Sequence, residues 1–341
     1  MPRQADTSGS DHPAVRPAEL AERASSAAGR PVRDLVPLQG GASSLTFRAR
    51  WADGDGSGPL VVKVAPPGVP PVRNRDVLRQ ARILRSLSKE QDVLVPEVLF
   101  EDAGTPPDVP PLFGMSFVTG DSLDPNIDPD ITLPPPADVT GRARHAAEVL
   151  AALHRVDPQR IGLDGEPAGT LTSEIDRWVR AFGTVPDDLR PGADAVAERL
   201  GASVPDACDP ALLHGDYRLG NALCEGDRLR AVIDWEIWSI GDPRLDLAWF
   251  LLTADPDAHP SAQRRAPGMP GPKELRAVYA DAGGPATTGL EWFRALALFK
   301  LAAASALIAK NARRRGETSG FGVRAARQVP DMIARARAAL A

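Results

Sequence analysis

The hydrophobic residues of this chain follow one pattern before residue 120 and another after residue 140. The first stretch holds short apolar or β-branched runs separated by Gly-, Asp- and Pro-rich segments, which is typical of strands and turns. In the second stretch, apolar residues recur every three or four positions, which is typical of helices. The pattern therefore predicts a small sheet-rich lobe followed by a larger, mainly helical lobe.

Each lobe divides into elements at Pro, Gly and polar clusters. In the first we expect a flexible tail at 1–16, helices at 17–30 and 73–91, and strands at 34–39, 45–51, 59–67, 97–102 and 111–118. In the second we expect two short strands flanking a turn at 226–228, and helices at 140–156, 171–182, 192–201, 243–252, 272–283, 290–315 and 324–340. The Pro- and Asp-rich segment 120–139 is typical of a loop. The result is an α+β protein with an N-terminal lobe at 17–115 and a C-terminal lobe at 116–341.

Composition and charge narrow the class of function. The chain has 40 Lys and Arg against 45 Asp and Glu, for a net charge of -5, which disfavours broad nucleic-acid binding. Hydrophobic residues make up 43% of the chain, enough for a folded core. There are two cysteines, too few for a disulfide framework, and neither a signal peptide nor a run of 18 apolar residues is visible. We expect a cytoplasmic protein without a nucleic-acid or membrane partner.

The densest group of polar residues lies between apolar runs at 212–250. His214, Asp216 and Asn221 share one short loop, and Asp234 follows the apolar run 231–233. An acid at a strand end, facing a loop with Asp and Asn, is a natural oxygen site for magnesium. The five-residue interval from Asp216 to Asn221 is also that of the kinase catalytic loop. A His-Gly-Asp sequence alone is common by chance, and Asp in loops often caps or solvates, but the four residues together favour a site.

Two features of the first lobe are candidates for nucleotide binding. Lys63 lies within the apolar strand VVKVA, where an ammonium is costly unless it reaches a partner or water. The alternative is a lysine on an edge strand with its tip in solvent. The turn GGASS could bring backbone close to phosphate, with further contacts from serine hydroxyls, although a plain hairpin turn explains the glycines equally well. Its candidate residues are Gly40, Gly41, Ser43 and Ser44.

The segments HGDYRLGN and VIDWEIWSIGDPRLDLAWF resemble the aminoglycoside phosphotransferase and choline kinase family, which has a two-lobed protein-kinase-like fold. The resemblance runs from about residue 33 to 315 and is strongest at 212–250. It implies that Asp216 is the catalytic base and that His214 orients the loop. It also implies that Asn221 and Asp234 hold magnesium, and that Lys63 contacts the α- and β-phosphates of ATP or GTP.

The resemblance also draws attention to the segment joining the lobes and to one departure from the family. Backbone at Ser116, Phe117 and Val118 would contact the purine, although a plain buried strand explains these residues equally well. The family usually pairs its strand lysine with a Glu on the next helix, where this chain has Gln80. Either Gln80 binds the ammonium without neutralising it, or the helix is shifted by a turn and Asp76 is the partner.

These residues predict a small-molecule kinase that uses magnesium and ATP, or GTP, to phosphorylate a hydroxyl. The chain looks more like the branch that includes the kinase-like domains attached to acyl-CoA dehydrogenases than like resistance enzymes. The acceptor of the phosphate is expected to be an antibiotic or a metabolite such as a hydroxyacyl thioester. We expect helices within 140–205 and 255–315 to bind it. The alternative is a catalytically weakened, nucleotide-binding regulatory module. We expect a monomer or homodimer.

Several conspicuous residues are interpreted as structural. His145 and His154 are nine positions apart on one helix, so they do not share a metal-binding face. Asp246 is expected to support the catalytic loop, because a buried Asp needs partners. Cys224 is expected to lie in the core. Three tryptophans could line a cleft but are interpreted as core residues, because large aromatic side chains in a helical lobe are most often buried: Trp235, Trp238 and Trp249.

Overall fold

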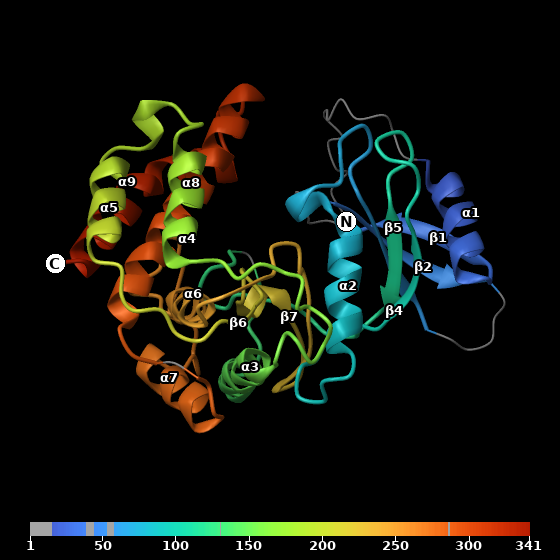
Figure 1. Ribbon diagram of the computed structural model, residues 1–341, viewed down its shortest axis with the longest axis horizontal. Coiled ribbons are helices and arrows are strands. Elements are labelled where there is room, and N and C mark those ends of the chain that lie inside the picture. The colour runs from blue at the N-terminus through green and yellow to red at the C-terminus, as the bar shows by residue number, and fades with distance from the viewer. Residues whose placement is uncertain (1–15, 39–43, 53–57, 130, 286) are drawn as a thin grey trace. The chain divides into compact units, whose positions relative to one another are not determined.

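The computed structural model describes residues 16–38, 44–52, 58–129, 131–285 and 287–341. Two compact units are present (Figure 1): residues 1–89 with 96–118, and residues 90–95 with 119–341. The chain therefore passes between units after Val118, and the short segment 90–95 belongs with the second unit. The first unit is sheet-rich and the second mainly helical, as the hydrophobic pattern predicts.

The first unit is built on a five-stranded antiparallel sheet of order β1-β2-β3-β5-β4. Its elements are α1 (Pro17–Ala28), β1 (Val32–Pro37), β2 (Leu45–Trp51), β3 (Leu60–Val64), a 3₁₀ turn (Arg73–Arg75), α2 (Val77–Leu87), β4 (Val98–Asp102) and β5 (Leu112–Ser116). Strand β3 lies in the middle of the sheet, and all five of its residues are buried. Leu60, Val62 and Val64 pack in one core with α1. Because side chains alternate along a strand, Lys63 points to the opposite face.

The second unit is organised around its longest helices. Its α-helices are α3 (Pro136–Arg155), α4 (Leu171–Phe182), α5 (Ala193–Ala202), α6 (Arg244–Ala254), α7 (Pro272–Asp281), α8 (Leu290–Arg314) and α9 (Phe321–Ala339). Its strands and 3₁₀ turns are β6 (Ala211–Leu213), β7 (Ala222–Glu225), β8 (Arg228–Val232), β9 (Ser239–Gly241), Asp187–Leu189 and Leu219–Asn221. Helix α8 packs against α4, α5, α6 and α9. Its buried face is rich in alanine, which lets neighbouring helices approach closely.

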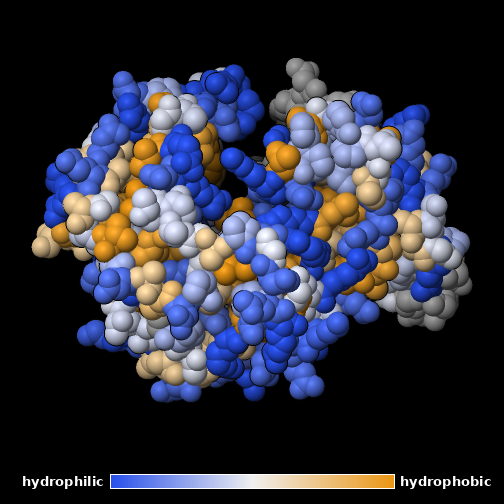
Figure 2. Space-filling view, in the orientation of Figure 1, coloured by the Kyte–Doolittle hydropathy of each residue, from blue (hydrophilic) through white to orange (hydrophobic). Residues whose placement is uncertain are grey.

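Helix α8 is long and apolar enough to cross a membrane by length and composition alone. In its most apolar window, however, 67% of the residues are buried within the unit, as in the central helix of a helical core. In each unit, the face seen in Figure 2 carries many hydrophilic side chains, with hydrophobic areas scattered among them.

Several elements differ from the prediction. Helix α2 begins at Val77 and ends at Leu87, inside the predicted range 73–91, because Asp76 is its N-cap. Helix α3 begins at Pro136, inside the segment interpreted as loop, because Pro is well suited to the first helical turn. Helix α9 begins at Phe321, three residues before the expected start. Strands β6 and β9 pair antiparallel but have three residues each, too few to show an alternating pattern. These two strands lie on either side of the predicted catalytic motif in the sequence.

Candidate active site

The predicted catalytic residues of the second unit converge through two short pairs of strands. Strand β6 ends at Leu213, so the loop beginning at His214 starts at its end. Strands β7 and β8 form an antiparallel hairpin. Asn221 precedes this hairpin and Asp234 follows it, and the backbone N–H of Ile233 donates to the carbonyl of Asn221 at 2.9 Å. Asn221 and Asp234 therefore lie at the same end of the hairpin.

Both carboxylate oxygens of Asp216 accept hydrogen bonds. The indole Nε1 of Trp249 donates to Oδ1 at 2.7 Å, and Nδ2 of Asn221 donates to Oδ2 at 2.9 Å. Arg218 adds a longer contact, with its Nε 3.4 Å from Oδ2. Trp249 is buried, as expected, but its N–H is directed to the candidate base, which the apolar pattern around it does not reveal. The carboxylate plane is thus fixed from two sides.

His214 has a defined tautomer. Its Nδ1 accepts from the backbone N–H of Asp216 at 3.1 Å, so Nε2 carries the proton and donates to the carbonyl of Ile233 at 2.9 Å. The imidazole therefore ties the Asp216 loop to the residue before Asp234. The side chain is fully buried. This geometry is that of an orienting residue, because both ring nitrogens are already engaged with backbone.

Asp246, on α6, holds the start of the same loop. Its two oxygens accept from the backbone N–H groups of His214 at 2.6 Å and Gly215 at 2.9 Å. The carboxylate is buried, and burial alone would raise its pKa. The nearby His154 and Lys300 act against burial, and the pKa of Asp246 lies below its usual value. A carboxylate held in its charged form can anchor both N–H groups.

His154 lies behind that carboxylate. Its Nε2 is 3.8 Å from Oδ2 of Asp246, too long for a hydrogen bond, and its Nδ1 is 2.8 Å from the hydroxyl of Tyr279. Nε2 has no hydrogen-bond partner among the described residues. His154 is therefore a packed residue beneath the loop. His145 lies apart from it, with its Nδ1 accepting from the backbone N–H of Leu229 at 3.0 Å.

Asn221 and Asp234 can supply oxygen ligands to a hard cation. The amide nitrogen of Asn221 is engaged with the carbonyl and carboxylate of Asp216, which leaves its Oδ1 as the atom that could bind metal. Asp234 adopts a left-handed backbone conformation with φ 67°, which is uncommon for residues other than Gly, Asn and Asp and is often associated with functional sites. Across the described ranges, no group of three or more His, Cys, Asp or Glu side chains could hold a metal by itself.

Lys63 is neither on an edge strand nor directed to solvent. It is 7% exposed on the central strand β3, and its Nζ donates to Oε1 of Gln80 at 2.9 Å. The interpretation as an edge-strand lysine is therefore wrong. Asp76 is instead the N-cap of α2, accepting from the backbone N–H of Arg79 at 3.0 Å. Helix α2 thus has the register that brings Gln80, the departure from the family pattern, to the lysine.

The other predicted nucleotide-binding residues are only partly within the described structure. Gly40, Gly41 and Ser43 lie outside the described residues, and Ser44 is buried at the start of β2. Ser116 ends β5, where its Oγ accepts from the backbone N–H of Glu97 at 2.9 Å. Phe117 lies beneath the guanidinium of Arg48, at 5.2 Å from the ring centroid, and Val118 is half-buried. Ser116 and Phe117 are thus engaged within the first unit.

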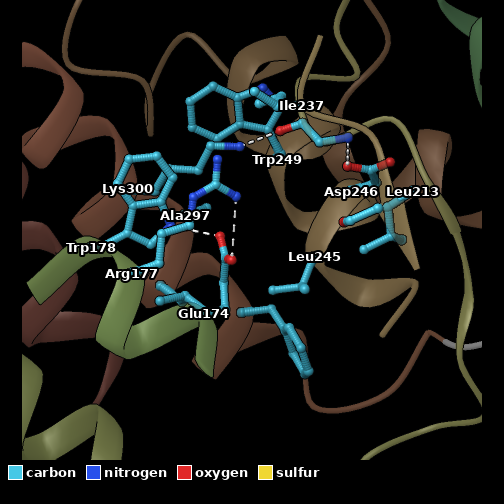
Figure 3. A pocket seen from close by; sticks show the side chains of 14 residues that line it. Glu174, Arg177, Trp178, Leu213, Ile237, Leu245, Asp246, Trp249, Ala297 and Lys300 are labelled. Carbon is cyan, nitrogen blue, oxygen red and sulfur yellow. Dashed lines mark hydrogen bonds and ion pairs between the residues drawn. The ribbon is translucent and has the colours of Figure 1, made fainter. Parts of the chain in front are cut away.

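A pocket in the second unit lies beside the loop that carries Asp216 (Figure 3). Two indole rings, from Trp178 of α4 and Trp249 of α6, form part of its wall. Its charged residues balance: Glu174 and Asp246 are acidic, and Arg177 and Lys300 are basic. The remaining lining residues are mostly apolar: Leu213, Gly215, Ile237, Ser239, Leu245, Phe293, Leu296 and Ala297. Trp235 and Trp238 are almost fully buried and Cys224 is buried, as expected of core residues.

A sheet-rich unit with a buried strand lysine, followed by a mainly helical unit whose loop carries Asp216 and Asn221, is the arrangement of the protein-kinase-like fold. The chain belongs to the phosphotransferase enzyme family, whose pattern matches residues 34–315. A Ralstonia eutropha JMP134 protein, provisionally described as an aminoglycoside phosphotransferase, has a similar structure, with a TM-score of 0.75 and 23% identity over 91% of this chain and 93% of that one.

Two further proteins are similar to this chain, one in structure and one in sequence. Aminoglycoside phosphotransferase APH(4)-Ia, solved with AMP-PNP and hygromycin B, has a TM-score of 0.58 and 16% identity over 93% of this chain and 98% of that chain. Human acyl-CoA dehydrogenase family member 11 is 29% identical over 205 residues, which cover 56% of this chain and 26% of that protein. The matched region spans only 20% to 36% of the length of the curated relatives.

Proposed function

We propose that this protein is a magnesium-dependent kinase that transfers the γ-phosphate of ATP, or GTP, to a hydroxyl group of a small molecule. The observation that carries the proposal is the way in which the carboxylate of Asp216 is held by hydrogen bonds. Its carboxylate is held by Trp249 and Asn221 beside an open pocket, with the oxygen atoms of Asn221 and Asp234 at the end of the adjoining hairpin. Phosphoryl transfer needs mainly such positioned groups.

In this proposal Asp216 accepts the proton of the acceptor hydroxyl and fixes the oxygen for attack on the phosphate. His214 keeps the loop in place through its two backbone hydrogen bonds. Lys63, oriented by Gln80, binds the α- and β-phosphates. Asn221 and Asp234 hold magnesium, which supplies charge neutralisation at the phosphates when bound.

The lining of the pocket favours some acceptors over others. A polycationic aminoglycoside would be attracted by a strongly acidic site. Here two acidic residues face two basic ones, and two indole rings provide apolar surface. This balance favours a neutral or mixed-charge metabolite hydroxyl, such as a hydroxyacyl thioester, over a polycationic antibiotic. The human protein similar to this chain is named as a member of the acyl-CoA dehydrogenase family, which also supports an acyl thioester as the acceptor.

The proposal is tested by an acceptor screen with magnesium and ATP or GTP. Hydroxyacyl thioesters, hydroxy acids, sugars, aminoglycosides and macrolides are incubated with the protein, and mass spectrometry detects a product heavier by one phosphate. Formation of such a product, together with stoichiometric ADP or GDP, is expected for at least one hydroxyl compound. Nucleotide binding in a thermal-shift assay, without any phosphorylated product, would instead indicate the regulatory module that Gln80 suggests.

Substitutions at Gln80 test how Lys63 is held. Gln80→Leu removes the acceptor at 2.9 Å from the ammonium, and a hydrogen bond to a charged group is worth about 1.5–3 kcal/mol. We expect Gln80→Leu to lower thermal stability and to raise KM for ATP roughly tenfold, since each 1.4 kcal/mol is about a factor of ten. Gln80→Glu preserves an acceptor and adds opposite charge, so its KM should equal or fall below that of the wild type. Equal KM values for the Leu and wild-type proteins would show that Gln80 does not orient Lys63.

A further inference from the structure

Two side chains from different helices reach the Asp216 loop from the pocket side. Trp249 lies on α6 and donates its indole N–H to Oδ1 of Asp216 at 2.7 Å. Lys300 lies near the middle of α8, and its ammonium donates to the backbone carbonyl of Gly215, the residue before the candidate base. Figure 3 shows both side chains in the pocket, with a dashed line from the lysine to this carbonyl.

Lys300 also contacts the indole directly. Its Nζ lies 4.1 Å from the ring centroid of Trp249, and 5.9 Å from that of Trp178. A cation over an indole face is held by the quadrupole of the ring, and the interaction strengthens when both partners are shielded from water. Burial lowers the pKa of Lys300, although the nearby carboxylates of Asp216, Glu174 and Asp246 act in the opposite direction. The ammonium therefore fixes both the plane of the indole and the peptide that precedes the base.

We propose that Trp249 and Lys300 are positioning residues for phosphoryl transfer, acting through Asp216. This inference rests on the proposed kinase function. Lys300 holds the Gly215 carbonyl and the indole ring, and the indole N–H holds one carboxylate oxygen, while Asn221 holds the other. A carboxylate fixed in this way keeps the orientation needed to take a proton from the acceptor, and misplacement by about 1 Å can lower a rate roughly 100-fold.

The kinetic test compares two buried tryptophans. Trp249→Phe keeps an aromatic ring but removes the N–H, and Trp292→Phe does the same to an equally buried indole that donates to the carbonyl of Leu200. We expect Trp249→Phe to lower kcat about 10- to 100-fold with KM for ATP unchanged. Trp292→Phe should leave both values near wild type. Turnover is measured with the acceptor found by the screen, or with water as acceptor. Equal kcat for the two variants, or a loss confined to KM, would overturn the proposal.

The lysine has an equally close control. Lys310 lies on the same helix and also donates to a backbone carbonyl, that of Thr184 at 2.8 Å. Lys300→Met should lower kcat about tenfold or more. Lys300→Arg should have a kcat between those of Lys300→Met and the wild type, because Arg also stacks on indole. Lys310→Met should have no effect on kcat. Recovery by Arg separates a role of the charge from simple packing. If Met and Arg at position 300 are equally impaired, the ammonium is not the positioning group.

A spectroscopic test separates this inference from the kinase proposal, because it needs neither nucleotide nor acceptor. In a ¹H–¹⁵N spectrum, the indole signal of Trp249 is assigned by its loss in Trp249→Phe. Its proton shift should lie downfield, as expected for a donor to a carboxylate, and should move in Asp216→Asn and in Lys300→Met but not in Lys310→Met. A signal that none of these substitutions moves would refute the positioning role, even if the protein proves to be a kinase.

Discussion

Asp216→Asn is expected to lower kcat for phosphoryl transfer about 100- to 10,000-fold, the range in which a positioned general base contributes. The amide cannot accept the proton of the acceptor hydroxyl. Nucleotide binding should persist, because Lys63 and Asp234 are unchanged. The measurement is ADP release with the acceptor identified by the screen, alongside a nucleotide titration followed by thermal shift. Wild-type turnover in Asp216→Asn would exclude Asp216 as the base.

The same substitution has a second effect that must be separated from the first. Both oxygens of Asp216 accept from N–H donors, Trp249 on one side and Asn221 on the other. An Asn amide has only one acceptor, so its NH₂ group must face one of these donors, which is expected to lower the free energy of unfolding by about 1–3 kcal/mol.

A double variant distinguishes the two effects. In Asp216→Asn with Trp249→Phe, the amide NH₂ no longer faces an indole N–H, so part of the stability should return. Activity should not return, because no base is present. If activity recovers together with stability, then Asp216→Asn lowers activity because it disturbs the loop structure, and not because it removes the proton acceptor. The coupling between the two sites is read as a double-mutant cycle.

Asp246→Ala is expected to cause the largest loss of stability among these variants, about 3 kcal/mol or more. The substitution removes the acceptor of two buried backbone N–H groups, at His214 and Gly215, and leaves a cavity in α6. Urea unfolding measures the loss. Asp255→Ala is a suitable control: at the other end of α6 this carboxylate accepts one backbone N–H at an exposed position, so the loss should stay below about 1 kcal/mol. Similar losses in both variants would contradict the anchoring role of Asp246.

The contribution of Asp246 should also depend on pH. Its pKa is lowered in the folded protein: burial opposes the charged form, and the nearby His154 and Lys300 more than compensate. The folded state therefore binds fewer protons at this group than the unfolded chain, whose Asp pKa is about 3.9. The stabilisation is complete above that value and is lost as pH falls through the lower, folded-state value. The difference in unfolding free energy between wild type and Asp246→Ala should be constant near neutral pH and should shrink below about pH 4.

The elements that the sequence predicts well are those with long periodic patterns. Helix α4 has the predicted bounds, and the central strand around Lys63 follows from its apolar neighbours. The candidate catalytic loop could be proposed from the sequence because His214, Asp216 and Asn221 are close together along the chain. By contrast, the start of α3 at Pro136 depends on its packing, since a Pro-rich segment is compatible with either loop or first turn.

The side chains that approach the loop from a distance could not be predicted in the same way. Trp249 and Lys300 lie within apolar helices, where the pattern says that a residue is buried but not where its polar atom points. The direction of the indole N–H depends on how α6 packs against the loop. The position of the ammonium depends on how α8 packs against α6. The spacing of residues along one helix does not predict how that helix packs against another. A Lys within an apolar stretch of helix does indicate that its ammonium needs a polar partner.

The left-handed backbone at Asp234 reverses the usual ranking of conservative replacements. Glu keeps the negative charge, but side chains other than Asn, Asp and Gly rarely adopt a φ of 67°. In a saturation library scored separately for abundance and for turnover, Asn and Gly should therefore remain abundant while losing turnover, and Glu should lose both. Glu, the amino acid most similar to Asp in charge, would then be among the least tolerated at position 234. The substitutions tolerated at this one position would distinguish the requirement for a left-handed backbone from the requirement for a carboxylate ligand.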